Sequence, residues 1–212
     1  MRDIPDLVDG YRSFLAGRYA EQAALYRRLS ARGQSPKTLI VACCDSRADP
    51  ATIFDAAPGA LFVLRNVANL IPPYAPDGDY HGTSAAIEFA VTVLEVENVV
   101  VMGHGQCGGV AAFLDKARRP ASPGDFIGKW MSLLDAAVDA AGRHAHGGDA
   151  AERHRAVEFA TIRLSLDNLL SFPFVRDRVA AGRLRLRGAW FEIATGRLLA
   201  MDPETGAFTP VA

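Results

Sequence analysis

The chain has 212 residues, of which 50% are hydrophobic and 22% are charged, a composition that excludes a disordered protein and allows a sizeable buried core. The length favours a single domain over residues 1–212, because it is about one and a half times the commonest domain size. The formal net charge is -1, which gives no reason to expect nucleic acid or an anionic membrane as a partner. We expect small molecules as partners instead.

Apolar side chains recur at helical intervals through the first 32 residues, with charged residues between them. This pattern predicts an amphipathic N-terminal helical arm over residues 1–32, followed by a core over residues 33–212. A glycine and a proline end the arm, and Thr38–Cys43 is then a continuous apolar run of strand length. Such a run is typical of a strand that is buried on both faces.

A short helix is expected next, because Asp49 supplies an N-cap and Pro50 a first-turn proline. It should end near Pro58, and residues 60–64 are predicted to form a second buried strand. A proline-rich loop follows, and Thr83–Leu94 is predicted to be a helix that Thr83 caps, with its small and apolar residues on one face.

A third buried strand is predicted over Asn98–Met102, and it leads directly into the glycine-rich segment 103–109. Helices should dominate from there to about residue 180. Two further strands, 184–193 and 198–201, are predicted around a Thr-Gly turn. Strands that alternate with helices favour an α/β fold with a mostly parallel central sheet flanked by helices. The expected breaks in the helical region lie around 118–124 and 142–148.

The cysteines, Cys43, Cys44 and Cys107, are too few for a disulfide scaffold and cannot all pair within one chain. Their number alone is compatible with three buried thiols. No apolar run resembles a secretory signal, and none approaches the roughly 18 to 20 residues of a membrane-spanning helix. We therefore expect a cytoplasmic protein without a membrane partner.

Chemically active side chains gather where two of the predicted strands end. Cys43, Asp45 and Arg47 follow the first strand, and His104 and Cys107 follow the third. Because ligands bind at the carboxyl ends of strands in open α/β sheets, the two groups are expected to meet. Two thiolates and an imidazole suit zinc, and a Cys2His set with an open fourth position is a catalytic arrangement.

The alternation of side chains along extended chain separates the adjacent cysteines. Residues i and i+2 share one face, so Cys43 and Asp45 belong together, and Cys44 faces the other way. We expect Cys44 to be a small core residue.

These residues carry a family resemblance: the chain resembles the β-class carbonic anhydrases, closely over about residues 33–112 and more loosely at the last strand pair. The resemblance implies an α/β enzyme that acts on carbon dioxide and bicarbonate. The segments that follow the family's pattern in order and spacing are Cys43-Cys44-Asp45-Ser46-Arg47, Arg65-Asn66-Val67-Ala68-Asn69, Pro72-Pro73-Tyr74, Ala85–Ala90, Val99–Gly103 and His104-Gly105-Gln106-Cys107-Gly108-Gly109.

By this resemblance, Cys43, His104 and Cys107 hold one zinc ion per subunit, and Cys44 takes the motif's variable position. The fourth zinc position holds water, whose pKa a catalytic zinc lowers to about 7. The implied reaction is the reversible hydration of CO2 to bicarbonate and a proton by attack of zinc-bound hydroxide. Two thiolates offset the charge of the ion, so activity should rise toward alkaline pH.

Asp45 and Arg47 lie two residues apart, and without the resemblance a solvent-exposed ion pair of little consequence is the favoured interpretation. The resemblance reverses this preference and implies catalytic roles for both. In relatives the matching aspartate accepts a hydrogen bond from the zinc-bound hydroxide. When it is released from the arginine, it can become the fourth zinc ligand and close the site.

The resemblance also implies a substrate pocket. Gln34 taken alone is a loop residue, but its spacing before Cys43 matches a glutamine that binds substrate or bicarbonate, often across a subunit interface. The backbone N–H of Gly108 would face a substrate oxygen, as a helix N-terminus favours. An apolar lining for an uncharged, linear substrate would come from Phe62, Val67 and Phe89.

Two positions depart from patterns in the family, and the second of them, Ile40, favours the plant-like, non-allosteric branch. Phe89 stands where many plant-type relatives have tyrosine, so that hydroxyl is absent. Ile40 stands where the regulated bacterial branch has a tryptophan that helps to form an inhibitory bicarbonate site, and isoleucine cannot donate an N–H there. We expect bicarbonate to inhibit only as a competitive product.

The arm is expected to embrace a second subunit, as in relatives, which gives a homodimer or a multiple of dimers such as a homotetramer. Two alternatives to CO2 hydration remain at this point. The same scaffold could hydrolyse carbonyl sulfide or carbon disulfide, which are also small, linear and apolar. The chain could instead be a noncatalytic zinc-binding or redox-sensing module with Cys44 as its reactive thiol.

Overall fold

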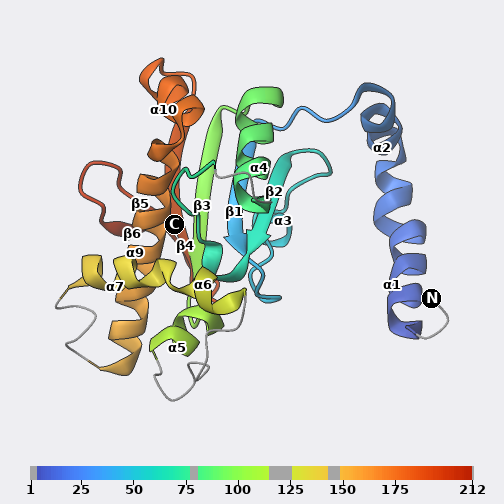
Figure 1. The fold of residues 1–212 in the computed structure, drawn as a ribbon. Helices are drawn as coiled ribbons and strands as arrows, with labels where there is room; N and C mark the ends of the chain where they lie inside the picture. Colours follow the sequence, from blue (N-terminus) through green and yellow to red (C-terminus); the bar gives the residue numbers. More distant parts are fainter. Residues whose placement is uncertain (1–3, 77–80, 115–125, 143–148, 212) are drawn as a thin grey trace.

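The computed structural model describes residues 4–76, 81–114, 126–142 and 149–211, and Figure 1 shows a central sheet with a separate helical arm. The strands of the sheet are β1 Thr38–Cys43, β2 Leu61–Asn66, β3 Asn98–His104, β4 Arg185–Phe191, β5 Leu198–Met201 and β6 Phe208–Pro210. Their order is β2-β1-β3-β4-β5-β6, with β1 to β4 parallel and the last two antiparallel. The mostly parallel α/β fold is thus confirmed, and β6 is a strand that the sequence patterns did not indicate.

Helices precede and follow these strands in the order that the periodicity predicts. The helical elements are α1 Pro5–Phe14, η1 Leu15–Tyr19, α2 Ala20–Arg32, α3 Pro50–Ile53, η2 Val67–Asn69, α4 Gly82–Glu88, η3 Phe89–Val93, α5 Gly108–Leu114, α6 Ile127–Met131, α7 Leu133–Ala141, α9 Ala150–Ser171 and α10 Pro173–Ala180. The predicted helix breaks at 118–124 and 142–148 lie outside the described residues, except for residue 142. Within the described part of the chain, no helix has the length and apolar character that crossing a membrane requires.

The two faces of the sheet bury different sets of residues. Leu39 and Val41 of β1 point into the main core, which α4, η3, α9 and α10 cover with buried side chains such as Ile87 and Leu169. On the opposite face, Ile40 lies in a smaller cluster to which α3 contributes Ile53. The side chains of β1 therefore alternate between two apolar layers, which is why its sequence is apolar throughout.

Three predicted details differ from the structure. β2 lies at the edge of the sheet, so it is only partly buried and Val63 is 39% exposed. Asp49 caps α3 as predicted, but the helix ends at Ile53, before Asp55, which has a φ of 45°. α4 begins at Gly82 without a side-chain cap, so Thr83 lies inside the helix, and its hydroxyl accepts a hydrogen bond from Asn66.

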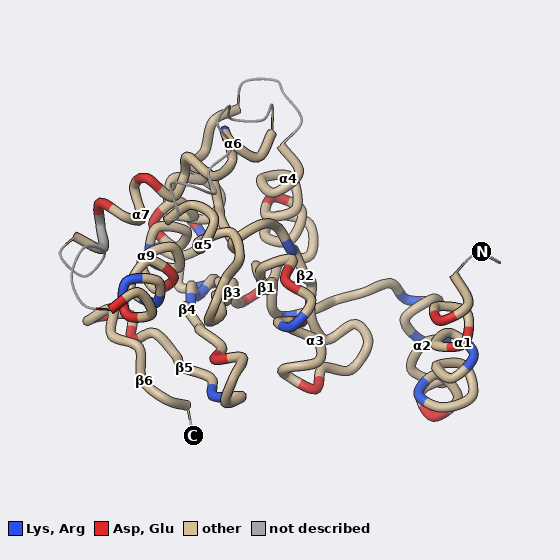
Figure 2. The backbone as a smooth tube through the Cα atoms, turned by 90° about the horizontal axis from the view of Figure 1, so that it is seen from below, with Lys and Arg blue, Asp and Glu red and all other residues tan. Residues whose placement is uncertain are grey.

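The arm stands apart from the core and is joined to β1 by a short linker (Figure 1). None of its residues from Pro5 to Arg32 is buried, and its exposed apolar side chains include Leu7, Tyr11 and Leu15. Acidic and basic residues are interspersed along α1 and α2 (Figure 2). Leu29 near the end of α2 does approach the core at Gly59, but α1 has no buried residue and so lacks the contacts that normally stabilise an amphipathic helix.

Candidate metal centre

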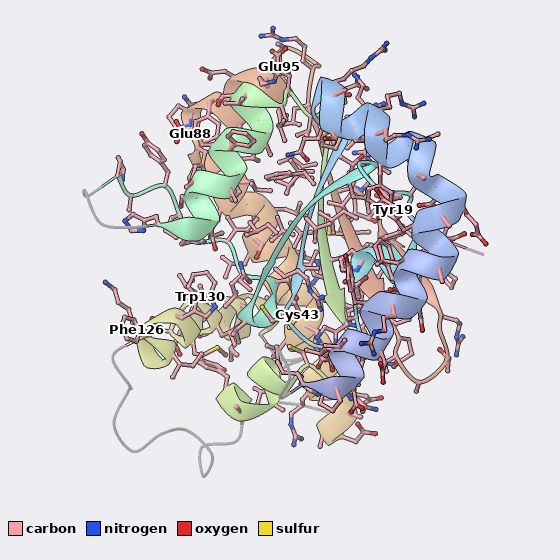
Figure 3. All side chains as sticks on the ribbon, turned by 90° about the vertical axis from the view of Figure 1, so that its right-hand side faces the viewer. Tyr19, Cys43, Glu88, Glu95, Phe126 and Trp130 are labelled. Carbon is pink, nitrogen blue, oxygen red and sulfur yellow. The ribbon has the colours of Figure 1, made fainter. Side chains whose placement is uncertain are left out.

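Three metal-ligating side chains meet at the carboxyl end of the parallel strands. Cys43 is the last residue of β1, His104 is the last residue of the adjacent β3, and Cys107 follows just before α5. The ligand atoms of these residues lie within 4.8 Å of one another, and all three residues are buried. We call them the CHC cluster. Figure 3 shows Cys43 at this end of the sheet, with Trp130 of α6 nearby.

The imidazole of His104 is oriented as a metal ligand requires. Its Nδ1 lies 2.9 Å from the carbonyl oxygen of Gly105, and because a carbonyl only accepts, Nδ1 carries the proton. The buried Nε2 has no hydrogen-bond partner among the described residues, and it faces Asp45 Oδ2 at 3.9 Å. A buried imidazole lone pair without a partner, opposite a backbone-bound N–H, is the arrangement found in histidine ligands.

The two thiols complete a set of donors that fits zinc. The hydrogen bond between them lowers the pKa of Cys43 and raises the pKa of Cys107, because the first thiolate disfavours the second. A divalent cation between them would favour both thiolates at once. Ligand atoms in a tetrahedral zinc site are separated by about 3.5 to 4 Å, given Zn–S and Zn–N bonds of about 2.3 and 2.0 Å. The packing of the CHC cluster is compatible with these separations.

Asp45 and Arg47 form a two-pronged ion pair beside the CHC cluster. Arg47 Nε donates to Asp45 Oδ1 at 3.0 Å, and Nη2 donates to Oδ2 at 2.8 Å. The backbone N–H of Arg47 also donates to Oδ1, at 3.0 Å. These hydrogen bonds hold the pKa of Asp45 well below its usual range, so the carboxylate is ionised and fixed in direction. The predicted common face of Cys43 and Asp45 agrees with this arrangement.

Arg65 of β2 supports the loop that carries these residues, a role that the sequence analysis did not assign. Its guanidinium donates to the carbonyl oxygen of Cys43 at 2.8 Å and to that of Asp45 at 2.7 Å. A third hydrogen bond, of 3.0 Å, joins it to the carboxylate of Asp49. The backbone on both sides of Cys44 is therefore held by one side chain from the neighbouring strand.

Residues 66–70 form a tight turn that packs against the start of α5. Ala68 and Asn69 have positive φ angles of 63° and 48°, and the Asn66 side chain bonds both backbone groups of Leu70. A Cβ atom on Gly109 would lie 3.2 Å from the Cβ of Ala68, which is tighter than ordinary contact. A glycine at position 109 thus allows this close approach without displacing the turn.

A buried polar group on α9 contacts Cys107, and the sequence analysis missed it. Glu158 is 4% exposed, and its Oε1 accepts the backbone N–H of Cys107 at 2.9 Å. Burial raises the pKa of Glu158 to about 7. One helical turn earlier, His154 Nε2 lies 3.1 Å from the Cys107 carbonyl oxygen, and burial lowers the pKa of His154. The only signal in the sequence was a His-Glu pair four residues apart, on a helix face that continues with the polar residues Thr161 and Ser165.

The proposed pocket residues fall into two groups. Val67 and Gly108 lie beside the CHC cluster, in the turn after β2 and at the start of α5. Phe62 and Phe89 contact each other, with ring centroids 5.9 Å apart, but Phe62 pairs with Leu39, four positions before the pair formed by Cys43. At about 3.3 Å per residue this separation is about 13 Å along the strand, so Phe62 lies away from its own chain's cluster.

Gln34 is exposed and lies in the linker that enters β1 at the end opposite the CHC cluster (Figure 1). The strand between them, Thr38–Cys43, spans about 17 Å at about 3.3 Å per residue. The structure therefore does not bring Gln34 to the cluster of its own chain.

The prediction that Cys44 is a core residue is wrong, because Cys44 is exposed whereas Cys43 and Cys107 are buried. Cys44 does follow the strand rather than belong to it, and its N–H donates to the carbonyl of Asn66. The alternation argument correctly separated it from Cys43, but past the last residue of β1 the described residues leave the opposite face uncovered.

Comparisons with known proteins agree with this site. A family model described as carbonic anhydrase matches residues 38–198, a range that contains the whole CHC cluster. A carbonic anhydrase of Pseudomonas aeruginosa is 35% identical over 207 residues, which cover 98% of this chain and 91% of the relative. The solved β-carbonic anhydrase CcaA matches with a TM-score of 0.90 at 29% identity, over 98% of this chain and 99% of that one. A tetrameric β-carbonic anhydrase of Sordaria macrospora is 26% identical with a TM-score of 0.82, over 99% of this chain and 100% of that one.

Proposed function

The chain belongs to the β-class carbonic anhydrase family, and from that premise we propose how its own residues bind and orient the reactants of CO2 hydration. The enzyme's metal site is the CHC cluster, which holds zinc. One observation carries the assignment: three buried ligand atoms converge, and His104 Nε2 has no other partner in the described part of the chain. When bound, zinc supplies a Lewis acid and makes water acidic enough to act as a nucleophile near neutral pH.

Asp45 orients the attacking water in this proposal. Its carboxylate is ionised and can only accept hydrogen bonds, so it would accept a hydrogen bond from the water and orient an oxygen lone pair toward CO2. Arg47 prevents rotation of the carboxylate by binding both of its oxygens. This pairing supports an open resting state, in which Asp45 is not itself a fourth metal ligand. The closed state requires the Arg47 contacts to break.

The substrate pocket combines residues from two subunits. Val67 and Gly108 lie next to the CHC cluster of their own chain, where the N–H of Gly108 is available to a substrate oxygen. Gln34 and the contacting rings of Phe62 and Phe89 lie too far along the sheet to serve that cluster. All three are therefore assigned to the site of a neighbouring subunit, where they contribute an amide and an apolar wall.

Self-association supports this sharing. A relative of the same fold is tetrameric, and the arm leaves Leu7, Tyr11 and Leu15 exposed with no surface of its own core to cover them. We assign the arm to the surface of a second subunit, in a dimer or a multiple of dimers. The half-buried face of β2 beside the linker offers further apolar surface for the same contact.

The plant-like branch without an allosteric bicarbonate site is part of the proposal. Ile40 is 2% exposed in the smaller cluster of the sheet and has no N–H or aromatic ring to offer an anion. Inhibition of hydration by bicarbonate should therefore be competitive, with a Hill coefficient of about 1. Cooperative inhibition would contradict this branch assignment.

A reducing compartment, the cytoplasm, suits the chemistry of the thiols. Cys43 and Cys107 bind metal only when they are reduced, and Cys44, which follows Cys43 in the sequence, is an exposed third thiol.

Stopped-flow CO2 hydration by the zinc-loaded protein is the direct test of the activity. We expect rapid hydration that increases toward alkaline pH, together with slow release of sulfide from carbonyl sulfide and carbon disulfide. Negligible hydration with rapid sulfide release would instead assign the scaffold to the sulfur substrates.

A further inference from the structure

The glycine-rich segment that carries Cys107 does not by itself fix its own backbone conformation. Glycines at 105, 108 and 109 surround it, and the preceding Gln106 has a φ of 56°, in the left-handed region. Unlike Cys43, which is the last residue of a strand paired on both sides, Cys107 lies between β3 and α5 and outside the sheet. Glycine-rich chain is conformationally permissive, so the direction of the Cys107 thiol depends on contacts from elsewhere.

Two side chains of α9 provide those contacts from one helical face. The Cys107 N–H donates to Glu158 Oε1 at 2.9 Å, and the Cys107 carbonyl lies 3.1 Å from His154 Nε2. Because a carbonyl only accepts, Nε2 of His154 carries the proton and donates it. We call Glu158 and His154 the α9 clamp. It binds both backbone groups of a single ligand residue, and the Cys107 carbonyl also accepts the N–H of Ala111 at 2.9 Å in the first turn of α5.

The clamp is in turn connected to the strand beside the other ligands. Oε2 of Glu158 accepts the indole N–H of Trp190 at 3.0 Å, and Trp190 is 3% exposed. Trp190 lies on β4 and pairs with Gly103, the residue before His104. One buried carboxylate therefore links the loop that carries Cys107 to the strand position next to His104.

The contacts to Cys107 and Trp190 require both oxygen atoms of the Glu158 side chain to act as hydrogen-bond acceptors. Two N–H donors converge on Glu158, one at each oxygen, and both oxygens of a carboxyl group can accept. A glutamine of the same shape has one oxygen and one NH2 group, so one of the two donors would face another donor. A buried N–H that loses its acceptor carries the full cost of its desolvation.

We propose that the α9 clamp is a positioning device for the metal site, in which Glu158 and His154 set the direction of the Cys107 thiolate relative to His104. The inference rests on the proposed zinc-dependent function and deepens it. Neither residue touches substrate in this account, because both act through the backbone of Cys107. Groups that orient metal ligands typically contribute about 10- to 100-fold to metal affinity or activity.

Metal binding by Glu158→Gln tests the proposal. We expect its zinc dissociation constant, measured by competition with a chelator, to rise about 10- to 100-fold. The thiolate and ligand-field bands of the cobalt-substituted protein should shift as well. Thr161→Val is the matched control, because Thr161 is a buried polar residue of the same helix whose hydroxyl donates to the carbonyl of Val157 within α9. Its zinc affinity and cobalt spectrum should equal those of the wild type.

A rescue experiment separates positioning from a general loss of structure. Trp190→Phe removes the donor that opposes the new amide, so the double variant Glu158→Gln/Trp190→Phe should recover most of the zinc affinity lost in Glu158→Gln. Wild-type zinc affinity and cobalt bands in Glu158→Gln would overturn the proposal. Equal losses in Glu158→Gln and Thr161→Val would also overturn it.

A replacement variant and a separate measurement of CO2 hydration complete the test of the α9 clamp. If Glu158→Gln does not fold, His154→Phe at the half-buried end of the clamp takes its place, and unchanged zinc affinity in that variant overturns the proposal. Hydration of CO2 by the wild type is recorded separately. A wild type that binds zinc without hydrating CO2 contradicts the proposed function, whereas the affinity series still decides the clamp.

Discussion

Arg47 binds Asp45 through both carboxylate oxygens, and the oxygen that accepts from Nη2 at 2.8 Å is the one that faces His104 Nε2 at 3.9 Å. The guanidinium of Arg47 thus holds the Asp45 carboxylate next to the CHC cluster and fixes its orientation. A planar fork of donors is needed for this, and lysine cannot reproduce it. Asp45 and Arg47 are two positions apart in the sequence, yet the orientation of their ion pair relative to the metal ligands is set by the folded loop.

Arg47→Lys should lower kcat/KM by at least about tenfold, because one ammonium group cannot hold both oxygens of Asp45. Zinc content should stay at one ion per subunit, since none of the three ligands changes. The measurement is stopped-flow hydration together with metal analysis. Arg12→Lys is a control, because the Arg12–Asp9 pair is exposed on the arm. Wild-type kcat/KM in Arg47→Lys would show that the fork has no role in catalysis.

Adjacent cysteines provide a matched pair for the metal assignment. Cys43→Ala removes a buried ligand and should abolish both zinc binding and CO2 hydration. Cys44→Ala changes an exposed side chain and should keep the zinc content and activity of the wild type. Elemental analysis and hydration assays on both variants make the comparison. Full activity in Cys43→Ala would refute the ligand set.

Complementation between inactive variants tests whether Gln34 acts across the subunit interface. Gln34→Ala keeps its CHC cluster but lacks the amide, and Cys43→Ala lacks the cluster but keeps the amide. When the two proteins are unfolded together and refolded, mixed assemblies should contain sites with both parts, and hydration should exceed the sum of the separate variants. If Gln34 serves its own chain, mixing produces no gain.

The arm should be required for assembly. Leu7→Asp combined with Tyr11→Asp introduces charge on the exposed apolar side of α1, and we expect a smaller particle by light scattering coupled to size-exclusion chromatography. Hydration should fall along with particle size, because the shared pocket is lost. Arg12→Ala, on the same helix, should leave the particle size unchanged. An unaltered assembly in the double variant would place the interface elsewhere.

Asp49 should contribute to stability in a pH-dependent way. Its hydrogen bond from the Thr52 N–H, with support from Arg65, holds the pKa of Asp49 below its usual value. A carboxyl with a lowered folded-state pKa stabilises above its unfolded pKa of about 4, and the contribution is lost as the pH falls through the folded value.

Comparison of the wild type with Asp49→Asn isolates this charge, because asparagine still caps α3. The wild type should be the more stable protein at pH 7, by less than about 1 kcal/mol for a partly exposed pair, and the difference should vanish in acid. Thermal unfolding between pH 3 and pH 7 measures it, with pH values chosen about one unit apart. A difference that grows as the pH falls would have the wrong sign.

Much of the fold and of the metal set could be predicted because the signals are local. Thr38–Cys43 is a strand with the predicted bounds, since a run of apolar residues on both faces reports burial directly. The alternation of side chains correctly grouped Cys43 with Asp45 and separated Cys44. The ligand spacing and motifs then indicated the chemistry.

Other features depended on contacts between distant segments, which local patterns do not encode. β2 has the composition of a buried strand but lies at the sheet edge, because strand order is decided by packing. Cys44 is exposed because β1 ends one residue earlier and no segment among the described residues covers that face. The sequence by itself thus determined the strands and the ligand types. Only the tertiary structure decided how Arg65 holds the Asp45 loop and how Glu158, 51 residues from Cys107, holds the last ligand, because each contact forms only when separate elements pack together.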